Sequence, residues 1–297
     1  MKSVLLVNLG TPAAPTPEAV RTYLAEFLAD PRVVKLPRWL WLPILHFVVL
    51  KKRPAVSAEK YAQIWTTEGS PLALNTVRQA VLLQEKLSVP VRYGMRYGRP
   101  KIEVQGLPDP VVIPLYPQYA ESTTESVRDV LPPGTRMLEN FHDHPAYIDA
   151  LAANVQRHWH RNGRGPVLVM SFPGLPKKDS ERYERECHAT GRLLADKLQL
   201  KSDAWCVTFQ SRFGYADWLQ PYTEPTLVAL ATQGAKRVDV VCPGFVSDCL
   251  ETLEELGIAA RRAFMAAGGR ELGLVACLNQ SPEWISALGE MARAPLA

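Results

Sequence analysis

Two glutamates near the end of the chain have the spacing for acid–base or metal chemistry. Glu251 and Glu255 follow the apolar run Arg237–Val241 and the dipeptide Pro243-Gly244. On a helix, residues four apart share one face, with Cβ atoms about 6 Å apart. In open α/β sheets, ligands bind just beyond the carboxyl ends of the strands. Two carboxylates at that place could accept protons or hand over a hard cation.

The same residues also have a structural interpretation. Asp248 and Glu251 have the spacing of a capping box, with Asp248 as N-cap and Glu251 reaching back to the Asp248 N–H. Acidic residues in a first turn also suit the helix dipole. Cys249 is two residues before Glu251, so we expect its thiol to face another way. Spacing alone leaves both interpretations open, and capping is the simpler one.

Alternating strand and helix signals predict the elements that position these residues. Such alternation favours parallel sheets with helices on both faces. The expected strands cover residues 3–8, 90–93, 111–115, 136–138, 167–172, 205–209, 237–241 and 274–277. The expected helices cover residues 17–28, 57–66, 73–87, 122–130, 144–160, 181–198, 224–233, 248–267 and 282–293. The sequence therefore predicts an α/β fold with two Rossmann-like domains, each a parallel sheet flanked by helices, and a cleft between them.

Two connections are short for this architecture. Parallel strands need a crossover of about a dozen residues or more, which is usually helical. Residues 100–110 and 131–135 leave little room for such a helix. We therefore expect one face of the first sheet to be uncovered.

Composition narrows the function classes. The chain has 297 residues, of which 47% are hydrophobic and 22% charged, so a folded protein with a large core is expected. A net charge of +4 without a basic stripe does not favour nucleic acid, but it would suit an anionic substrate. Five dispersed cysteines without a CxxC pair are typical of reduced thiols in a cytosolic protein. No GxGxxG or GxxxxGK[ST] motif is present, which argues against nucleotide binding.

An apolar segment, residues 36–50, is followed directly by Lys51, Lys52 and Arg53. Arg38 and two prolines exclude a transmembrane helix here, and no signal peptide precedes the first strand. An apolar segment with a basic flank can rest on an anionic bilayer. An ordinary buried helix and a dedicated membrane anchor are the alternatives.

Several runs together resemble the motifs of ferrochelatases, the class II chelatases that insert Fe(II) into a porphyrin at the end of haem synthesis. The resemblance covers nearly the whole chain, with the motifs in the family's order, and the longest match is the run 243–255. The other matching runs are Val4-Leu-Leu-Val-Asn8-Leu-Gly-Thr-Pro12, Gly69-Ser-Pro-Leu72, Gly94-Met-Arg96-Tyr97-Gly98, Pro114-Leu-Tyr116-Pro-Gln-Tyr119-Ala-Glu-Ser122-Thr123, Phe209-Gln-Ser-Arg-Phe-Gly214 and Trp218-Leu-Gln-Pro-Tyr-Thr223.

The resemblance implies a function and a set of site residues. It implies insertion of Fe(II) into protoporphyrin IX or coproporphyrin III, with Glu251 as base and metal handler and Glu255 extending an acidic track. Porphyrin and ferrous iron would be the partners. The residues implied to line the porphyrin are Arg96, Tyr97, Tyr116, Tyr119, Ser122, Trp218 and Phe245, with Arg96 and Ser122 suited to its propionates.

One position departs from the family pattern. Where the family has histidine in a Ser-Phe/Tyr-His-Gly-Leu/Ile-Pro run, this chain has Pro173 in Ser171-Phe-Pro-Gly-Leu-Pro176. Proline can neither accept a proton nor ligate a metal. The alternative to an active enzyme is therefore an impaired or non-catalytic tetrapyrrole-binding paralogue, and a third hypothesis is a chelatase for another metal or tetrapyrrole.

The resemblance also implies the domain plan and the location. Residues 1–143 and 281–297 would form the N-terminal domain, with residues 36–54 as a lip over the porphyrin cleft, and residues 144–280 the C-terminal domain. Some relatives hold a [2Fe–2S] cluster through C-terminal cysteines plus one more. Here the tail has only Cys277, and Glu121 stands where some relatives have the additional cysteine, so no cluster is expected. We expect a cytoplasmic protein, peripheral to the inner face of the membrane through residues 36–54.

Overall fold

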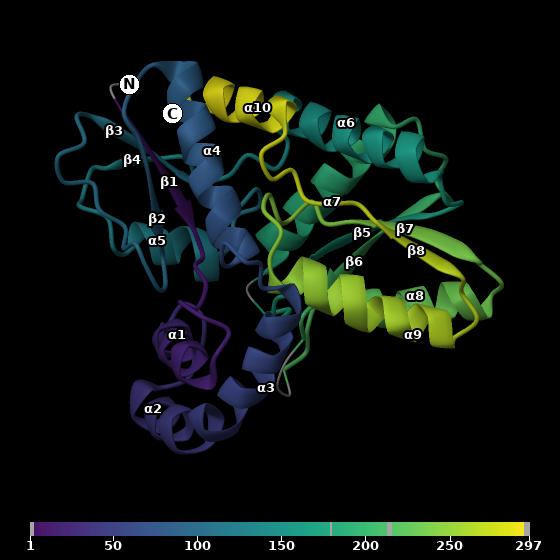
Figure 1. The fold of residues 1–297 in the computed structure, drawn as a ribbon, viewed down its shortest axis with the longest axis horizontal. Helices are drawn as coiled ribbons and strands as arrows, with labels where there is room; N and C mark the ends of the chain where they lie inside the picture. Colours follow the sequence, from purple (N-terminus) through teal and green to yellow (C-terminus); the bar gives the residue numbers. More distant parts are fainter. Residues whose placement is uncertain (1–2, 179, 213–215, 294–297) are drawn as a thin grey trace. The chain divides into compact units, whose positions relative to one another are not determined.

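The computed structural model describes residues 3–178, 180–212 and 216–293. The chain divides into two compact units. Unit 1 comprises Met1–Tyr116, Ala120–Asn140 and Leu288–Ala297, and unit 2 comprises Pro117–Tyr119 and Phe141–Ala287. Each unit contains a four-stranded parallel sheet with helices packed against it (Figure 1). This confirms the predicted α/β fold with two parallel sheets, each flanked by helices.

The unit 1 sheet has the strand order β2-β1-β3-β4. Its strands are β1 (Ser3–Asn8), β2 (Val91–Met95), β3 (Pro110–Pro114) and β4 (Arg136–Met137). The chain moves from β1 to β2 on one side and then crosses to β3 on the other. Such a reversal of strand order opens a crevice at the carboxyl ends of the two strands that flank it. In unit 1 these two strands are β1 and β3.

The helices of unit 1 include two short π-helices. They are α1 (Pro17–Ala29), α2 (Arg38–Ile44), η1 (Leu45–Val49, π), α3 (Leu50–Ile64), α4 (Pro71–Leu87), η2 (Glu121–Glu125, π) and α5 (Ser126–Arg128). Helix α4 contacts β1, where the Nδ2 of Asn8 donates to the Oγ1 of Thr76 at 2.9 Å. Helix α10 (Pro282–Arg293) begins in unit 2 and ends in unit 1.

The expectation of an uncovered sheet face in unit 1 is wrong. The short connection between β2 and β3 contains no helix, but its apolar side chains pack against the sheet. Leu107 is buried in a cluster with Leu5 and Val112, and Ile102 and Val104 pack against the same cluster. A loop with three apolar residues therefore covers this part of the sheet in place of a crossover helix.

The unit 2 sheet has the strand order β6-β5-β7-β8. Its strands are β5 (Leu168–Pro173), β6 (Trp205–Gln210), β7 (Arg237–Val241) and β8 (Glu271–Leu274). Met170 of the central strand pairs with Val207 on one side and Val241 on the other. The strand order reverses between β5 and β7, so the crevice of this sheet lies at their carboxyl ends.

Helices cover both faces of the unit 2 sheet (Figure 1). They are α6 (Pro145–Asn162), α7 (Glu181–Lys197), α8 (Thr223–Thr232), η3 (Glu251–Ala260, π), α9 (Arg261–Ala266) and the first part of α10. Val169 and Val240 form one buried cluster with Leu227 of α8 and Leu256 of η3. Gly191 of α7 lies instead against Val207 and Met170, on the opposite face.

Two predicted elements of unit 2 have different limits. The last strand is not 274–277 but Glu271–Leu274, because Glu271 pairs with Arg237 and Leu274 with Val240. The long helix expected at 248–267 begins later, and ten of its residues form the π-helix η3. A π-helix has i→i+5 hydrogen bonds and is frequent at functional sites.

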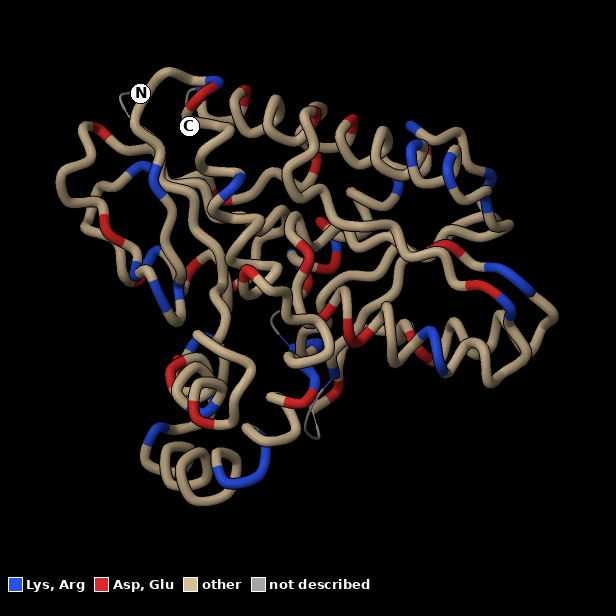
Figure 2. Tube along the Cα trace, viewed as in Figure 1, with Lys and Arg blue, Asp and Glu red and all other residues tan. Residues whose placement is uncertain are grey.

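The segment 36–54 is helical and strongly apolar on its outer side. Trp39, Phe47 and Val48 are 79%, 68% and 59% exposed, while Leu45 and Leu50 are buried. The segment contains no acidic residue, and Lys51, Lys52 and Arg53 follow its apolar part, residues 36–50 (Lys and Arg are blue in Figure 2). The alternative of an ordinary buried helix is therefore wrong. Among the described residues, no helix has both the length and the hydropathy that a membrane span requires.

Candidate functional site

The crevice of the unit 2 sheet brings Pro173 and Gly244 together. Pro173 is the last residue of β5, and Gly244 lies in the loop after β7. A Cβ atom on Gly244 would lie 2.5 Å from the Cδ of Pro173, so only glycine fits against this ring. The Pro173 carbonyl accepts a hydrogen bond of 2.8 Å from the Tyr183 hydroxyl. Residue 173 is therefore anchored at the place where this fold class binds ligands.

The loop after β7 leads directly into η3, which begins at Glu251. The capping-box interpretation of Asp248 and Glu251 is wrong. The Asp248 N–H donates to the Asn279 side chain at 2.9 Å. The Asp248 carboxylate accepts from Thr252, from Asn279 and from the backbone N–H of Cys277. Asp248 therefore ties the loop to the segment after β8, and Glu251 is not engaged as its capping partner.

Glu255 is held by both donors of one residue. The Ser211 N–H donates to Oε1 at 2.7 Å, and the Ser211 hydroxyl donates to Oε2 at 2.6 Å. Burial raises the pKa of Glu255, and repulsion from Glu251 raises it further, while the hydrogen bonds from Ser211 and Gln210 lower it. Both glutamates lie on η3, with Glu251 as its first residue.

Cys249 does not face away from Glu251, contrary to the expectation from spacing. Its thiol is 4% exposed, and burial raises its pKa. The Glu251 carboxylate raises that pKa further, through its charge and through a hydrogen bond with the thiol. A neutral thiol that donates to Glu251 is the state that this environment favours.

The two aromatic candidates of unit 2 lie close to this region and differ in burial. Trp218 is 4% exposed, and its ring lies 3.3 Å from the Cβ position of Gly174, next to Pro173. Phe245 is partly buried and packs against the cluster on the η3 face of the sheet. In the structure, both rings therefore contribute to the walls around the end of β5 and β7.

Tyr119 also belongs to unit 2, although its neighbours Tyr116 and Ser122 belong to unit 1. Its backbone N–H donates to the Glu186 carboxylate at 2.6 Å. The Arg182 guanidinium lies 4.0 Å from the centre of the Tyr119 ring and bonds the same carboxylate. Glu186 and Arg182 thus hold the Tyr119 backbone and one face of its ring.

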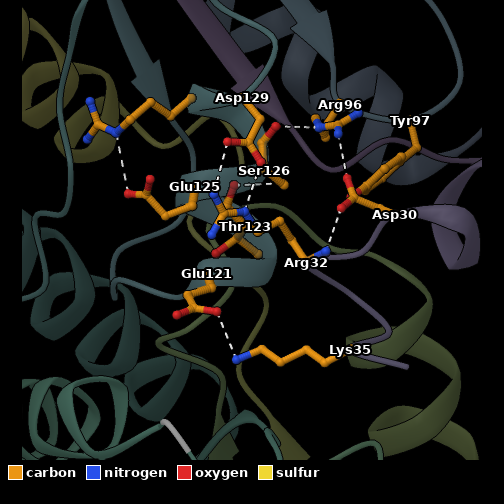
Figure 3. Close-up of polar contacts among 11 residues, drawn as sticks. Asp30, Arg32, Lys35, Arg96, Tyr97, Glu121, Thr123, Glu125, Ser126 and Asp129 are labelled. Carbon is orange, nitrogen blue, oxygen red and sulfur yellow. Dashed lines mark hydrogen bonds and ion pairs between the residues drawn. The ribbon is translucent and has the colours of Figure 1, made fainter. Parts of the chain in front are cut away.

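In unit 1, Arg96 follows β2 and is anchored on both sides (Figure 3). Its Nε donates to the Ser126 carbonyl at 2.6 Å, and its Nη2 lies 2.5 Å from the Asp30 carboxylate. The Tyr97 hydroxyl donates to the same Asp30 oxygen at 2.9 Å. Tyr97 is fully buried, and burial raises its pKa. Asp30 therefore holds two of the predicted porphyrin-binding residues in place.

The other unit 1 candidates differ in environment. Arg96 lines a cavity of about 240 Å³ together with Glu26, Lys101 and Ile102. The Tyr116 hydroxyl is buried and has no hydrogen-bond partner within the described part of the chain. Ser122 is half-buried in η2, which also carries Glu121, the partner of Lys35 in a 2.8 Å ion pair (Figure 3).

Three residues hold parts of these sites in place although the sequence analysis assigned them no role. They are Gln210, the last residue of β6, Ser211, which follows it, and Asp30, which follows α1. Gln210 and Ser211 lie in one of the matching runs, but that run continues into residues 213–215, which lie outside the described residues. A polar pair directly after an apolar strand is the signal that could have identified them.

Metal ligation is limited to small groups in the described residues. Among residues 3–178, 180–212 and 216–293, no group of three or more His, Cys, Asp or Glu side chains is arranged to hold a metal ion.

Comparison with known proteins relates this chain to one family. The family model described as Ferrochelatase matches residues 1–296. A protein named ferrochelatase from Aromatoleum aromaticum is 52% identical over 98% of this chain and 86% of its own length. A protein of the same name from Polaromonas sp. is 51% identical over 99% of this chain and 87% of its own length.

Solved structures share the fold at low sequence identity. SirB from Bacillus subtilis with Fe³⁺ has a TM-score of 0.57 and 14% identity, and the match covers 99% of this chain and 96% of that one. CbiX, described as the terminal enzyme for biosynthesis of siroheme in denitrifying bacteria, has a TM-score of 0.51 and 15% identity, with 99% and 100% covered. These matches support the two-sheet architecture and no finer statement.

Proposed function

The chain belongs to the ferrochelatase family, and we propose that it is a metal chelatase that inserts ferrous iron into a porphyrin to form haem. The observation that carries this proposal is the family match across residues 1–296, with an acidic π-helix at the crevice of unit 2. A non-catalytic tetrapyrrole-binding paralogue is not favoured, because relatives at 52% and 51% identity are named ferrochelatase.

The reaction sets three physical demands. The flat macrocycle must be gripped, its two inner N–H protons must be removed, and Fe(II) must lose its water and arrive from one face. Apolar walls grip the ring, a positioned base removes protons, and hard or borderline ligands release iron readily.

We assign the proton and metal roles to η3. Glu251 would accept a proton from the ring and contact the incoming iron. Glu255, whose pKa is raised by burial, would pass the proton on, because a carboxyl with a raised pKa exchanges protons nearer to neutral pH. Cys249 would keep the Glu251 carboxylate oriented through its thiol.

The porphyrin-binding roles are assigned unit by unit. In unit 2, the partly buried Tyr119 and Phe245 would present aromatic surface to the macrocycle, and the buried Trp218 would support the wall beside Pro173. In unit 1, Arg96 and Ser122 would bind the porphyrin propionates. Tyr97 and Tyr116 would support Arg96 and Ser122. Arg96 keeps part of its guanidinium beyond its bonds to Asp30 and Ser126, and it lines the cavity of unit 1.

One assay tests the proposal. Purified protein is mixed anaerobically with Fe(II) and with protoporphyrin IX or coproporphyrin III, and haem formation is followed against a no-enzyme control. We expect catalysed haem formation with at least one of the two porphyrins, and the preferred one identifies the substrate. Saturable porphyrin binding without any catalysed metallation would support the paralogue instead.

We expect no permanent cofactor. Cys277 in the tail is buried and its thiol pKa is raised well above the ordinary value by burial, which suits a neutral thiol rather than a cluster ligand. The purified protein should show no absorption of a [2Fe–2S] cluster before substrate is added, and iron at two atoms per chain with such a spectrum would contradict this.

We also propose that residues 36–54 contact an anionic membrane surface from the cytoplasmic side. Trp39 and Phe47 are the most exposed large apolar side chains of this segment, and Lys51, Lys52 and Arg53 would meet anionic headgroups. Apolar side chains beside a basic flank suit a bilayer interface better than water.

Vesicle co-sedimentation tests the membrane contact. Wild-type protein should bind phosphatidylcholine vesicles that contain phosphatidylglycerol, and bind them less at high salt. Trp39→Ser with Phe47→Ser should abolish binding. The matched control, Val81→Ser with Leu193→Ser, removes two exposed apolar side chains elsewhere and should bind like wild type. Equal loss in both double variants would contradict a specific surface.

A further inference from the structure

We propose that Ser211 is a positioning residue for metal insertion: it holds the Glu255 carboxylate in one orientation on η3. This inference rests on the proposed function, because it assigns Ser211 a role in that reaction. No sequence motif gives Ser211 this role. It follows from the geometry of one residue that donates twice to one carboxylate.

The two donors reach different oxygens. The Ser211 N–H bonds Oε1 at 2.7 Å and the Ser211 hydroxyl bonds Oε2 at 2.6 Å. Hydrogen bonds to a carboxylate are strong because the acceptor is charged, and two in parallel also fix the plane of the group. A single contact would leave the carboxylate free to rotate about its last bond.

The backbone of Ser211 is arranged for this task. Its φ is 64°, in the left-handed region that residues other than glycine rarely adopt. Strained backbone persists only where the surrounding structure maintains it, and it clusters at functional sites. In this backbone conformation, the N–H and the hydroxyl of Ser211 both point toward the Glu255 carboxylate.

The residue before it anchors the same turn to the start of η3. The Gln210 amide donates from Nε2 to the Glu251 carbonyl at 2.9 Å, and its Oε1 accepts from the Ser171 hydroxyl at 2.6 Å. Ser171 in turn bonds Thr223, which bonds Thr208. All of these polar side chains are buried, at no more than 5% exposure, so the network is rigid.

Gln210 and Ser211 therefore hold η3 in different ways. Gln210 fixes the backbone at Glu251 and also bonds the Glu255 carboxylate, whereas Ser211 donates to both oxygens of that carboxylate and so fixes its plane. A carboxylate that must exchange protons with a neighbour has to keep its distance and orientation, and a misplacement of about 1 Å can cost about 10²-fold in rate. Ser211 therefore acts through Glu255 and does not itself touch the substrate.

Two substitutions separate positioning from stability. Ser211→Gly keeps the N–H, relieves the left-handed φ and removes the side chain with its hydroxyl. Ser211→Thr keeps the hydroxyl but places a β-branched side chain at a positive φ, which is unfavourable. We expect Ser211→Gly to be as stable as wild type, or more stable, with kcat about 10- to 100-fold lower. We expect Ser211→Thr to be less stable and to retain most of kcat.

Ser88 provides the matched control for the backbone effect. It ends α4 in the left-handed region with φ 55° and lies in unit 1. Ser88→Gly should gain stability in the same way and leave kcat unchanged. The KM for porphyrin should be similar in all three variants, because Ser211 is assigned to proton handling and not to the grip on the macrocycle.

A double substitution gives the decisive comparison. In a Glu255→Gln background, Ser211→Gly should lower kcat no further, because its target is already altered. Overturning results are a wild-type kcat in folded Ser211→Gly, or a further full-sized loss in the double variant. A kcat that follows the melting temperature across the Ser211 variants would also overturn the proposal.

Failure of the proposed function would look different. If wild-type protein forms no haem with either porphyrin, that function fails, and the carboxylate contact is then judged by unfolding alone. In urea unfolding, the effects of Ser211→Gly and Glu255→Gln should be non-additive if the side chains hold each other. Additive effects would overturn the positioning role whatever the reaction.

Discussion

The Nη2 of Arg96 lies 2.5 Å from the carboxylate of Asp30, in an ion pair whose side chains are 15% and 5% exposed. The same carboxylate accepts the Tyr97 hydroxyl and the Arg32 backbone N–H (Figure 3). One acidic residue therefore satisfies three donors of unit 1. A second arginine–carboxylate pair nearby, Arg32 with Asp129, has side chains 35% and 44% exposed.

The first prediction compares these two pairs. Breaking a buried pair from one side leaves a buried charge without a partner and costs about 3–5 kcal/mol, whereas an exposed pair contributes about 0–1 kcal/mol. We expect Asp30→Asn to lower the free energy of unfolding by the larger amount and Asp129→Asn by the smaller. Urea unfolding followed by circular dichroism measures both, and equal losses would contradict the assignment of Asp30 as the structural anchor.

The second prediction concerns Glu251 as a chemical group. Glu251→Gln keeps the size of the side chain and removes its charge, so we expect the rate of haem formation to fall by about 10²-fold or more. Porphyrin binding, followed by quenching of tryptophan fluorescence, should persist. Glu224 is also acidic and lies in the first turn of its own helix, α8, so Glu224→Gln is the matched control. A similar rate loss in both variants would indicate a general effect of helix charge.

The third prediction is a pH dependence of stability from Glu255. Its pKa in the folded protein is raised above the ordinary value of 4.5, mainly by burial. The folded state therefore binds the proton more tightly than the unfolded state does. The stabilisation from this group is fully present below the unfolded pKa and is lost as the pH rises through the folded pKa.

Glu255→Gln should remove this dependence. We expect the free energy of unfolding of wild type, measured relative to Glu255→Gln, to decrease as the pH rises from about 4.5 towards neutrality. Urea unfolding at several pH values measures the difference. A difference that is constant with pH, or that grows with pH, would show that the pKa is not raised.

The fourth prediction concerns Pro173. An imidazole with an ordinary pKa of about 6.5 can accept a proton or bind metal at neutral pH, which proline cannot do, and a positioned base is worth about 10²–10⁴ in rate. We expect Pro173→His to raise the rate of haem formation. The Tyr183 hydroxyl bonds the carbonyl of residue 173, so the backbone should stay in place after substitution.

Gly244 sharpens this experiment. The Pro173 ring packs against Gly244, where a Cβ atom would lie 2.5 Å from the Cδ of Pro173. The side chain of a histidine at position 173 would therefore be restricted on one side by the backbone of Gly244. Pro173→Asn, which adds a polar side chain without a base, is the control and should not raise the rate. A fast wild type that Pro173→His does not improve would show that another residue has taken over the proton role.

Much of this protein could be predicted from the sequence because the information is local. Apolar runs of strand length, helical spacing and stop residues predict the alternating elements, and alternation itself favours two parallel sheets. The order of the family motifs along the chain gave the ferrochelatase relationship, which the comparisons confirm. The placing of Glu251 beyond the carboxyl end of a strand also followed from the sequence, because an apolar run and the Pro243-Gly244 dipeptide mark where that strand ends.

The tertiary structure decided what depends on partners distant in the chain. Asp248 does not form the predicted capping box. Its carboxylate instead accepts hydrogen bonds from the Asn279 side chain and the Cys277 N–H, which are 31 and 29 residues away in the sequence. The sheet face of unit 1 is covered by Leu107, because a loop can bury apolar side chains as well as a helix can. Ser211 meets Glu255 across 44 residues of sequence, and no spacing rule relates the two. The hydrogen-bond partners at a strand end depend on which elements lie side by side at that edge of the sheet. The packing of the whole unit determines this arrangement.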